Sequence, residues 1–232
     1  MSVGQRLDVA GAEDGRGLRW PVVQPGSTAQ RWLLACGVIG AALFSVVFTI
    51  EGAVRPGYDP WRDSINSLSL GPGGWVQRVN FVVYGLLVAT SAVGWRAALV
   101  PGAGATWAPL LRLIAGLGYV VCGICSQDPA PGYPPGAAVH ATPTAICLVL
   151  ARRFARKPRW RGWATYSIVT ILLVCAFMTT YGVALAHHGP AGLLEHLAGS
   201  SESLWELIFV ARLLLGNGHV SLAGAALTRA MS

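Results

Sequence analysis

An uncharged apolar run over residues 32–50 constrains the fold of this chain more than any other feature. At about 1.5 Å per residue, a helix over this run is about 28 Å long, close to the thickness of the hydrocarbon core of a bilayer. Composition agrees, because 53% of the 232 residues are apolar and only 12% are charged. A soluble domain normally carries about 25% charged residues. The composition therefore excludes a disordered chain and most soluble enzymes, and it indicates a membrane protein.

Five more apolar segments follow the first one. We expect an all-α membrane bundle of six transmembrane helices, with spans of about 32–50, 79–95, 107–125, 137–151, 163–185 and 204–215. This membrane domain covers residues 32–215, between a disordered cytoplasmic tail over 1–31 and a C-terminal tail over 216–232.

Three charged residues lie inside these predicted spans. Arg112 is expected to reach the membrane surface by snorkelling. Glu206 and Arg212 are six residues apart, so they point to different faces of one helix, and we expect each to reach water from its own end. Because of these two charges the last span is the weakest, and the alternatives are a start near Leu193 or a continuation through Val220–Leu227.

Basic residues predict the orientation of the bundle. Residues 152–161 contain six Lys and Arg side chains, and positively charged short loops stay in the cytoplasm. If both termini are cytoplasmic, fourteen of the 17 basic residues fall on the inner side. We therefore expect a multi-pass protein of the cell membrane. Its partner is the lipid bilayer rather than nucleic acid, because topology already explains the basic charge.

The first predicted outer loop, residues 55–75, is the most distinctive segment. Asp59-Pro60 is typical of a turn. Trp61, Ile65 and Leu68 recur at i, i+4 and i+7, which predicts a short helix near Pro60–Leu70 with these three side chains facing the bundle. Such a helix is either a lid over a site or a structural cap.

Polar groups of several kinds gather on the predicted outer side, which makes it the candidate site. Pro143 frees a backbone carbonyl one turn from His140, so this helix end needs a polar partner. We expect a cluster of Asp59, Asp128 and His140 at the outer mouth, serving either structure or binding. The full set of candidate site residues is Asp59, Asn66, Asp128, His140, Glu195 and Glu206.

The remaining cysteine and histidine motifs do not have the spacing of a metal site. Cys122 and Cys125 form a single CxxC without a second pair, and His187 and His188 are adjacent, so they do not share a helix face. The sequence therefore predicts no metal and no cofactor.

Several strings in the sequence form a recognisable pattern. They are Tyr58-Asp59-Pro60, Ser67-Leu68-Ser69-Leu70-Gly71, Gly74-Trp75-Val76-Gln77-Arg78-Val79-Asn80-Phe81, Asp128-Pro129, Gly132-Tyr133-Pro134-Pro135-Gly136, His140 and Gly192-Leu193-Leu194-Glu195. Together these strings resemble a family of bacterial membrane proteins known as "domain of unknown function 998". The resemblance covers about residues 32–215. It implies a compact six-helix integral membrane protein, and it implies no activity. One departure is His196, where the family pattern favours arginine.

Two functions are compatible with this arrangement. The first is a small-molecule or lipid-binding or transport-type module with a polar site at its extracytoplasmic face. The alternative is a membrane-embedded enzyme that acts on a lipid or envelope substrate there, with Asp59, Asp128, His140 and Glu195 as its acid–base groups. Geometry distinguishes the two functions, because an enzyme needs at least two of these four groups at one cavity and a binding module does not.

Overall fold

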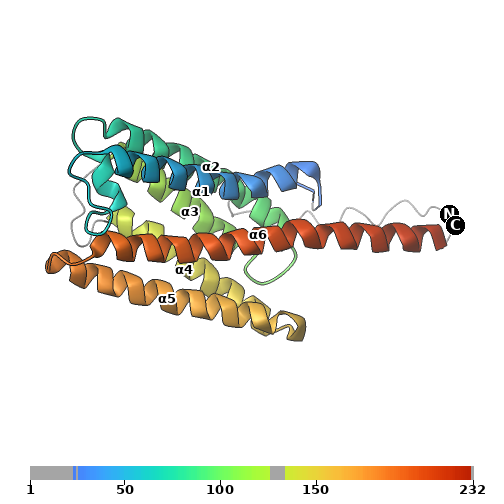
Figure 1. Cartoon of the computed structure of the whole chain (residues 1–232). Helices are drawn as coiled ribbons and strands as arrows, with labels where there is room; N and C mark the ends of the chain where they lie inside the picture. The colour runs from blue at the N-terminus through green and yellow to red at the C-terminus, as the bar shows by residue number, and fades with distance from the viewer. Residues whose placement is uncertain (1–22, 25, 126–133, 231–232) are drawn as a thin grey trace, which may run out of the picture.

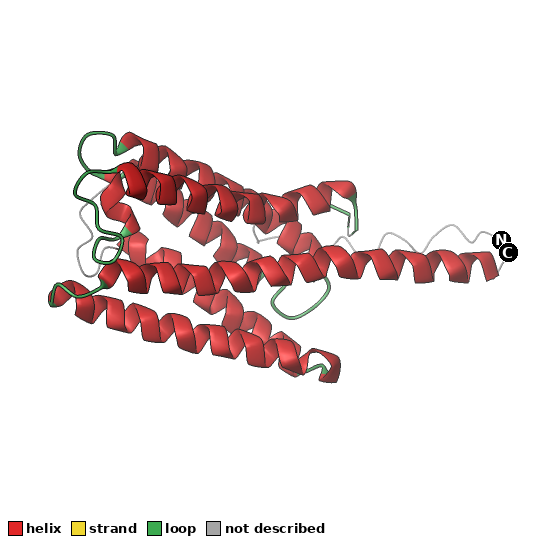
Figure 2. Ribbon diagram, viewed as in Figure 1, coloured by secondary structure: helices red, strands yellow, loops and turns green. Residues whose placement is uncertain are grey.

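The computed structural model describes residues 23–24, 26–125 and 134–230, with the backbone alone described for 134–138, 159 and 216–230. Over these residues the secondary structure is entirely helical, which confirms the all-α prediction (Figures 1 and 2). Six α-helices and two short 3-10 helices follow one another: α1 (Thr28–Val54), η1 (Ile65–Ser69), α2 (Trp75–Leu99), α3 (Trp107–Ile124), α4 (Pro134–Ala155), η2 (Pro158–Trp160), α5 (Arg161–Ala186) and α6 (Ala191–Ala230).

Four of these helices, α1, α2, α3 and α5, are long and apolar enough to cross a bilayer. The chain is therefore a multi-pass membrane protein. Helices α4 and α6 are more polar, because α4 contains His140 and Pro143 and α6 contains three glutamates. Helix α6 has 40 residues. It includes the predicted span over 204–215, starts earlier at Ala191, and extends past the other helices at its C-terminal end (Figure 1).

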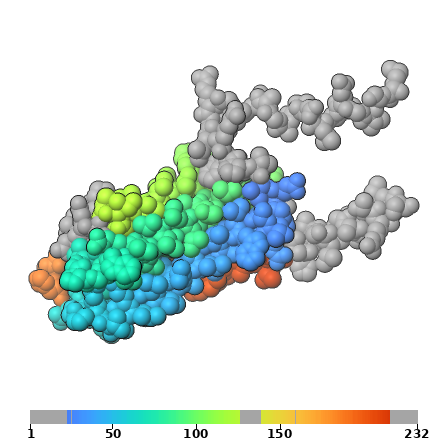
Figure 3. Space-filling model, turned by 90° about the horizontal axis from the view of Figure 1, so that it is seen from above, coloured from blue at the N-terminus to red at the C-terminus, as the bar shows by residue number. Residues whose placement is uncertain are grey.

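The helices pack mainly against their neighbours in the chain. α2 lies between α1 and α3, α4 lies between α3 and α5, and α6 packs along α5. α6 also meets α1 and α4 at fewer positions, which closes the bundle. Seen from above in Figure 3, α1 and α2 lie side by side and form much of the visible face.

Glycines bring α2 and α3 into direct backbone contact. A Cβ atom on Gly85 would lie 2.5 Å from the Gly116 carbonyl oxygen, and one on Gly116 would lie 2.6 Å from the Gly85 carbonyl oxygen. Two turns farther along α3, a Cβ on Gly123 would lie 2.6 Å from the carbonyl oxygen of Arg78. Because no side chain fits between these backbones, the two helices approach as closely as small-residue pairs in membranes do.

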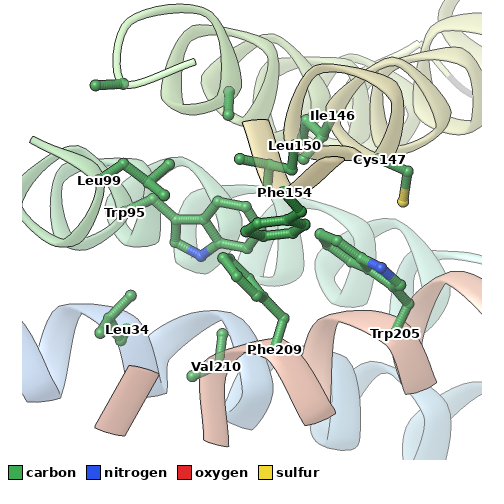
Figure 4. Close-up of a cluster of buried hydrophobic side chains, with 12 residues drawn as sticks. Leu34, Trp95, Leu99, Ile146, Cys147, Leu150, Phe154, Trp205, Phe209 and Val210 are labelled. Carbon is green, nitrogen blue, oxygen red and sulfur yellow. The ribbon is translucent and has the colours of Figure 1, made fainter. Parts of the chain in front are cut away.

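A cluster of aromatic side chains fills part of the interior of the bundle. Trp95 of α2, Phe154 of α4, and Trp205 and Phe209 of α6 converge there (Figure 4). The Trp205 and Phe209 rings are stacked at 5.2 Å, and the Trp205 indole donates to Ser167 Oγ of α5 at 3.0 Å. This cluster joins α6 to α2, α4 and α5, so it fixes the position of α6 in the bundle.

The two ends of the bundle carry different connections. The loop end carries residues 55–74 and 187–190, and the arginine end carries the α2–α3 and α4–α5 connections (Figure 1). At the arginine end Arg153 donates to the carbonyl oxygens of Leu99 at 2.7 Å and Ala103 at 3.0 Å. Arg153 therefore joins the end of α4 to the α2–α3 connection, so these two connections lie at the same end of the bundle.

The loop over residues 55–74 forms less helix than the apolar spacing predicts. Only η1 is helical, and although Leu68 is buried, Trp61 is 61% exposed, so its predicted inward orientation is wrong. The reason is a turn that interrupts the helical spacing. The Asp59 carboxylate accepts from the Trp61 amide at 3.0 Å, and the Asp59 amide donates to Asp63 Oδ2 at 2.8 Å. The Trp61 carbonyl accepts from the Leu193 amide at 3.2 Å, so the loop covers the start of α6.

Candidate functional site

A cavity of about 1230 Å³ lies inside the bundle, and side chains from all six helices and from η1 line it. Most of the lining residues are apolar. The volume exceeds the range of about 300–1,000 Å³ that is typical of pockets for drug-sized molecules. The cavity can therefore hold a ligand with a long apolar part.

Three carboxylates of α6 face this cavity. Glu195, Glu202 and Glu206 are separated by seven and then four residues, so they lie on one face of the helix, and all three line the cavity. Burying carboxylates among apolar groups costs free energy unless each one has a partner. The three have different partners, and these partners define the chemistry of the site.

Glu206 forms an ion pair with Arg112 of α3. Arg112 Nη1 lies 2.9 Å from Glu206 Oε2, and Nη2 contacts Oε1, so the pair is bidentate. The guanidinium also donates to Ser91 Oγ at 2.5 Å and lies over the Trp95 ring at 4.9 Å. Arg112 is buried. The expectation that Arg112 snorkels is therefore wrong, because the bundle itself supplies a counter-charge and an aromatic face.

Gly37 of α1 makes room for this ion pair. A Cβ atom there would collide with Arg112 Nη2 and would lie 2.7 Å from Glu206 Oε1 and 3.2 Å from Ser91 Oγ. The α1 backbone thus covers the pair on one side.

The second charge predicted within the last span, Arg212 of α6, does not depend on water alone, because its guanidinium lies 4.6 Å from the centre of the Trp160 ring.

Glu202 faces His140 of α4. His140 Nδ1 lies 3.6 Å from Glu202 Oε2, which is an ion-pair distance when the imidazole is protonated. The Glu202 side chain is only 9% exposed, and its Oε1 atom has no hydrogen-bond partner. Next to Pro143, the Thr144 hydroxyl donates to the His140 carbonyl at 3.0 Å, whereas the carbonyl that loses its amide donor to Pro143 is that of Val139.

Glu195 joins α6 to the loop end. Its Oε2 accepts from the Ile65 amide, the first residue of η1, at 2.8 Å. Tyr58 lies in the same loop, and burial raises the pKa of its phenol, with a further increase from the Glu195 and Asp63 carboxylates. Tyr58 therefore stays protonated and neutral, while Glu195 fixes η1 over the cavity.

Four of the six predicted site residues reach the cavity: Asn66, His140, Glu195 and Glu206. Asp59 does not line it. Its carboxylate is half exposed, and it serves its own loop by accepting from the Trp61 amide and by lying 3.8 Å from Arg62 Nε. Asp128 lies outside the described residues. His140 thus faces Glu202 and not Asp59, while nothing in the described residues tests its predicted contact with Asp128.

Aromatic rings form one wall of the cavity. Phe44 of α1 stacks on Tyr84 of α2 at 4.8 Å, and Tyr84 contacts Tyr119 of α3 at 4.5 Å. All three line the cavity. As for metal ligands, no group of three His, Cys, Asp or Glu side chains among the described residues is placed to hold an ion.

Comparison with known proteins gives one match. A family model described as "Protein of unknown function (DUF998)" matches residues 38–227. The chain belongs to this DUF998 family. No curated protein and no solved structure matches the chain.

The sequence analysis of this DUF998 protein missed two central residues, Arg112 and Glu202. A signal for both was present. Glu195, Glu202 and Glu206 have the spacing of one helix face, and Arg112 is the only charge within residues 107–125. The glutamate spacing is informative only with a helix that starts before Glu195, which the alternative start near Leu193 provides and the expected span from residue 204 does not.

Proposed function

We propose that this DUF998 protein binds a small amphiphilic molecule, such as a lipid, inside its helix bundle, as a transport-type module. The observation that carries this proposal is the cavity of about 1230 Å³ lined by all six helices. Its apolar walls suit a hydrocarbon body, and the charged groups of α3, α4 and α6 suit a polar head. Ligand sites with mainly apolar walls and a few convergent polar groups are the usual form of small-molecule sites.

We further propose that all six helices cross a bacterial cell membrane, with both termini in the cytoplasm. α4 and α6 are polar in composition, yet Glu202, Glu206 and His140 face the cavity rather than the lipid. Ionisable residues inside membrane proteins normally face the bundle interior in this way. The arginine end is then cytoplasmic because of its positive charge, and the loop end, with Glu195, is extracytoplasmic.

The binding proposal is tested by filling the cavity from Gly199 of α6. Gly199 lines the cavity, and a Cβ atom there would meet nothing within 4 Å, so Gly199→Phe adds bulk without a backbone clash. Gly162 is equally open but does not line the cavity. Gly162→Phe is therefore the matched control.

The probe is N-phenyl-1-naphthylamine, a neutral apolar fluorophore, added to the protein in phosphatidylcholine nanodiscs. Trp95 and Trp205 line the cavity, so a bound probe receives energy from them. We expect saturable energy transfer in the natural protein and in Gly162→Phe. In Gly199→Phe we expect only the non-saturable transfer to probe dissolved in the lipid, which persists because Trp32, Trp75 and Trp107 are exposed. Equal saturable transfer in both variants contradicts binding inside the bundle.

The alternative function, an enzyme acting on a lipid or envelope substrate, is favoured by one observation. His140 and Glu202 form a pair of the kind in which a carboxylate orients a histidine base, and Glu195 lines the same cavity. The two functions differ in their product. An enzyme converts phospholipids of the nanodisc into new species detectable by mass spectrometry, and His140→Asn abolishes the conversion. A binding module leaves the lipids unchanged.

A further inference from the structure

The charges around the cavity do not balance. Among the described lining residues, three carboxylates stand against one guanidinium, Arg112, and that guanidinium is bidentate with Glu206. Glu195 and Glu202 remain. Protonation of His140 offsets one of them, and His196 is the other imidazole on the cavity, so the cavity keeps an excess of negative charge while the glutamates are ionised and at least one of the two imidazoles is neutral.

Glu202 is the carboxylate with capacity left. Glu195 already accepts from the Ile65 amide. Glu202 lines the cavity and has His140 at 3.6 Å on one oxygen, while its other oxygen is buried and has no hydrogen-bond partner. A buried carboxyl in apolar surroundings either keeps its proton or faces a cation. The cavity next to Glu202 has room for a cation of some size.

The aromatic wall is complementary to such a cation. Phe44, Tyr84 and Tyr119 line the same cavity as Glu202, and these rings pack in one cluster with Val139, the neighbour of His140 on α4. Ring faces attract organic cations, most strongly where water is excluded. A carboxylate and several rings on one cavity therefore form a receptor for a substituted ammonium or phosphonium group rather than for a phosphate or carboxylate.

We infer that the ligand of this cavity is an organic cation with an apolar body, held by the Glu202 carboxylate and the rings of Tyr84 and Tyr119. This inference rests on the proposed function and specifies its ligand class. The apolar lining contributed by α5, including Ile171 and Val174, accommodates the body of the molecule. Arg112 serves a different purpose, because it neutralises Glu206 and leaves Glu202 to the ligand.

The test uses two ions of the same shape and opposite charge, tetraphenylphosphonium and tetraphenylborate. The full chain is reconstituted in phosphatidylcholine nanodiscs, and binding of radiolabelled tetraphenylphosphonium is measured by scintillation proximity. We expect saturable binding that tetraphenylborate does not compete for. Glu202→Gln is expected to weaken it roughly tenfold or more, the usual consequence of losing a buried charged contact. Asp59→Asn, which removes a carboxylate outside the cavity, is the matched control and leaves binding unchanged.

A second pair of variants keeps the test decisive if Glu202→Gln does not fold. Tyr119→Phe retains the ring and is expected to retain binding, whereas Tyr119→Leu removes the ring face and is expected to weaken it. Unchanged binding in both Glu202→Gln and Tyr119→Leu, or equal binding of the two ions, overturns the inference.

The outcomes also separate the inference from the proposed function. Binding of N-phenyl-1-naphthylamine that depends on Gly199, without specific binding of tetraphenylphosphonium, refutes the cationic ligand and leaves the amphiphile site standing. If neither probe binds saturably, both proposals fail. Binding of tetraphenylphosphonium that Gly199→Phe and Glu202→Gln both abolish supports both.

Discussion

Helix α3 has two sides that are built on different principles. On the side facing α2, Gly85 and Gly116 bring two backbones into contact without any charge between them. On the side facing α6, Arg112 reaches across to Glu206 beside a large cavity. The first interface is determined by shape and leaves no space, whereas the second is determined by charge and leaves space. A bundle that binds a molecule internally needs both, because only the second kind of interface can enclose a ligand.

The comparison is tested most strongly at Arg112. Arg112→Met leaves Glu206 buried without its counter-charge, and we expect a loss of about 3–5 kcal/mol in the free energy of unfolding. The measurement is unfolding by sodium dodecyl sulfate in mixed micelles, followed by near-ultraviolet circular dichroism. A loss below about 1 kcal/mol, the level of an exposed pair, contradicts a buried ion pair.

The double variant Arg112→Met with Glu206→Met is the control for that experiment. Because it removes both charges and replaces them with flexible apolar side chains, it is expected to recover most of the lost stability. A double variant as unstable as Arg112→Met shows that the loss comes from packing of the arginine and not from the stranded carboxylate.

The shape-determined interface is tested at Gly116. Gly116→Ala places a methyl group 2.6 Å from the Gly85 carbonyl oxygen, and a backbone atom cannot rotate away. We expect a loss toward the upper end of the usual 1–3 kcal/mol for overpacking, measured by the same unfolding method. Gly162→Ala, where a Cβ meets nothing within 4 Å, is the control and is expected to be neutral or slightly stabilising.

A smaller effect is expected at Gly37, where close backbone packing meets the buried ion pair. Gly37→Ala pushes a methyl group against the ion pair, but side chains can shift, so we expect a loss near 1 kcal/mol, the lower end of the same range. In the Arg112→Met, Glu206→Met background this loss should change, because the groups that the methyl meets are different. Additive effects of Gly37→Ala in the two backgrounds contradict a contact between Gly37 and the pair.

Much of the fold could be predicted from the sequence. The apolar runs within α1, α2, α3 and α5 are local signals, since an uncharged stretch of this length has few alternatives to a membrane helix. Helix α6 was harder to predict, because its three glutamates make its sequence resemble that of a surface helix. Only the neighbours in the bundle, α3 and α4, show that these glutamates face inward.

Individual residues of the site could be predicted from the sequence, whereas the pairs that they form could not. His140 and Glu195 were identified as candidates because polar groups are rare in such a chain. The partner of His140 could not be derived, since Glu202 is 62 positions away and only the packing of α4 near α6 brings them together. The helix predicted near Pro60–Leu70 was wrong for a local reason. The hydrogen bonds of Asp59 form a turn within the segment whose apolar spacing predicts a helix.

The row of glutamates on α6 has a consequence for how the cavity can change. Glu195, Glu202 and Glu206 belong to one continuous helix, so a rotation of that helix about its own axis cannot turn one carboxylate away and leave the others in place. A rotation by a single residue, about 100°, would turn all three away from the cavity at once. It would break the contacts with Arg112, His140 and Ile65 in the same movement. The direction in which the three carboxylates point is thus a property of α6 as a unit, and a rotation of α6 changes it for all three together.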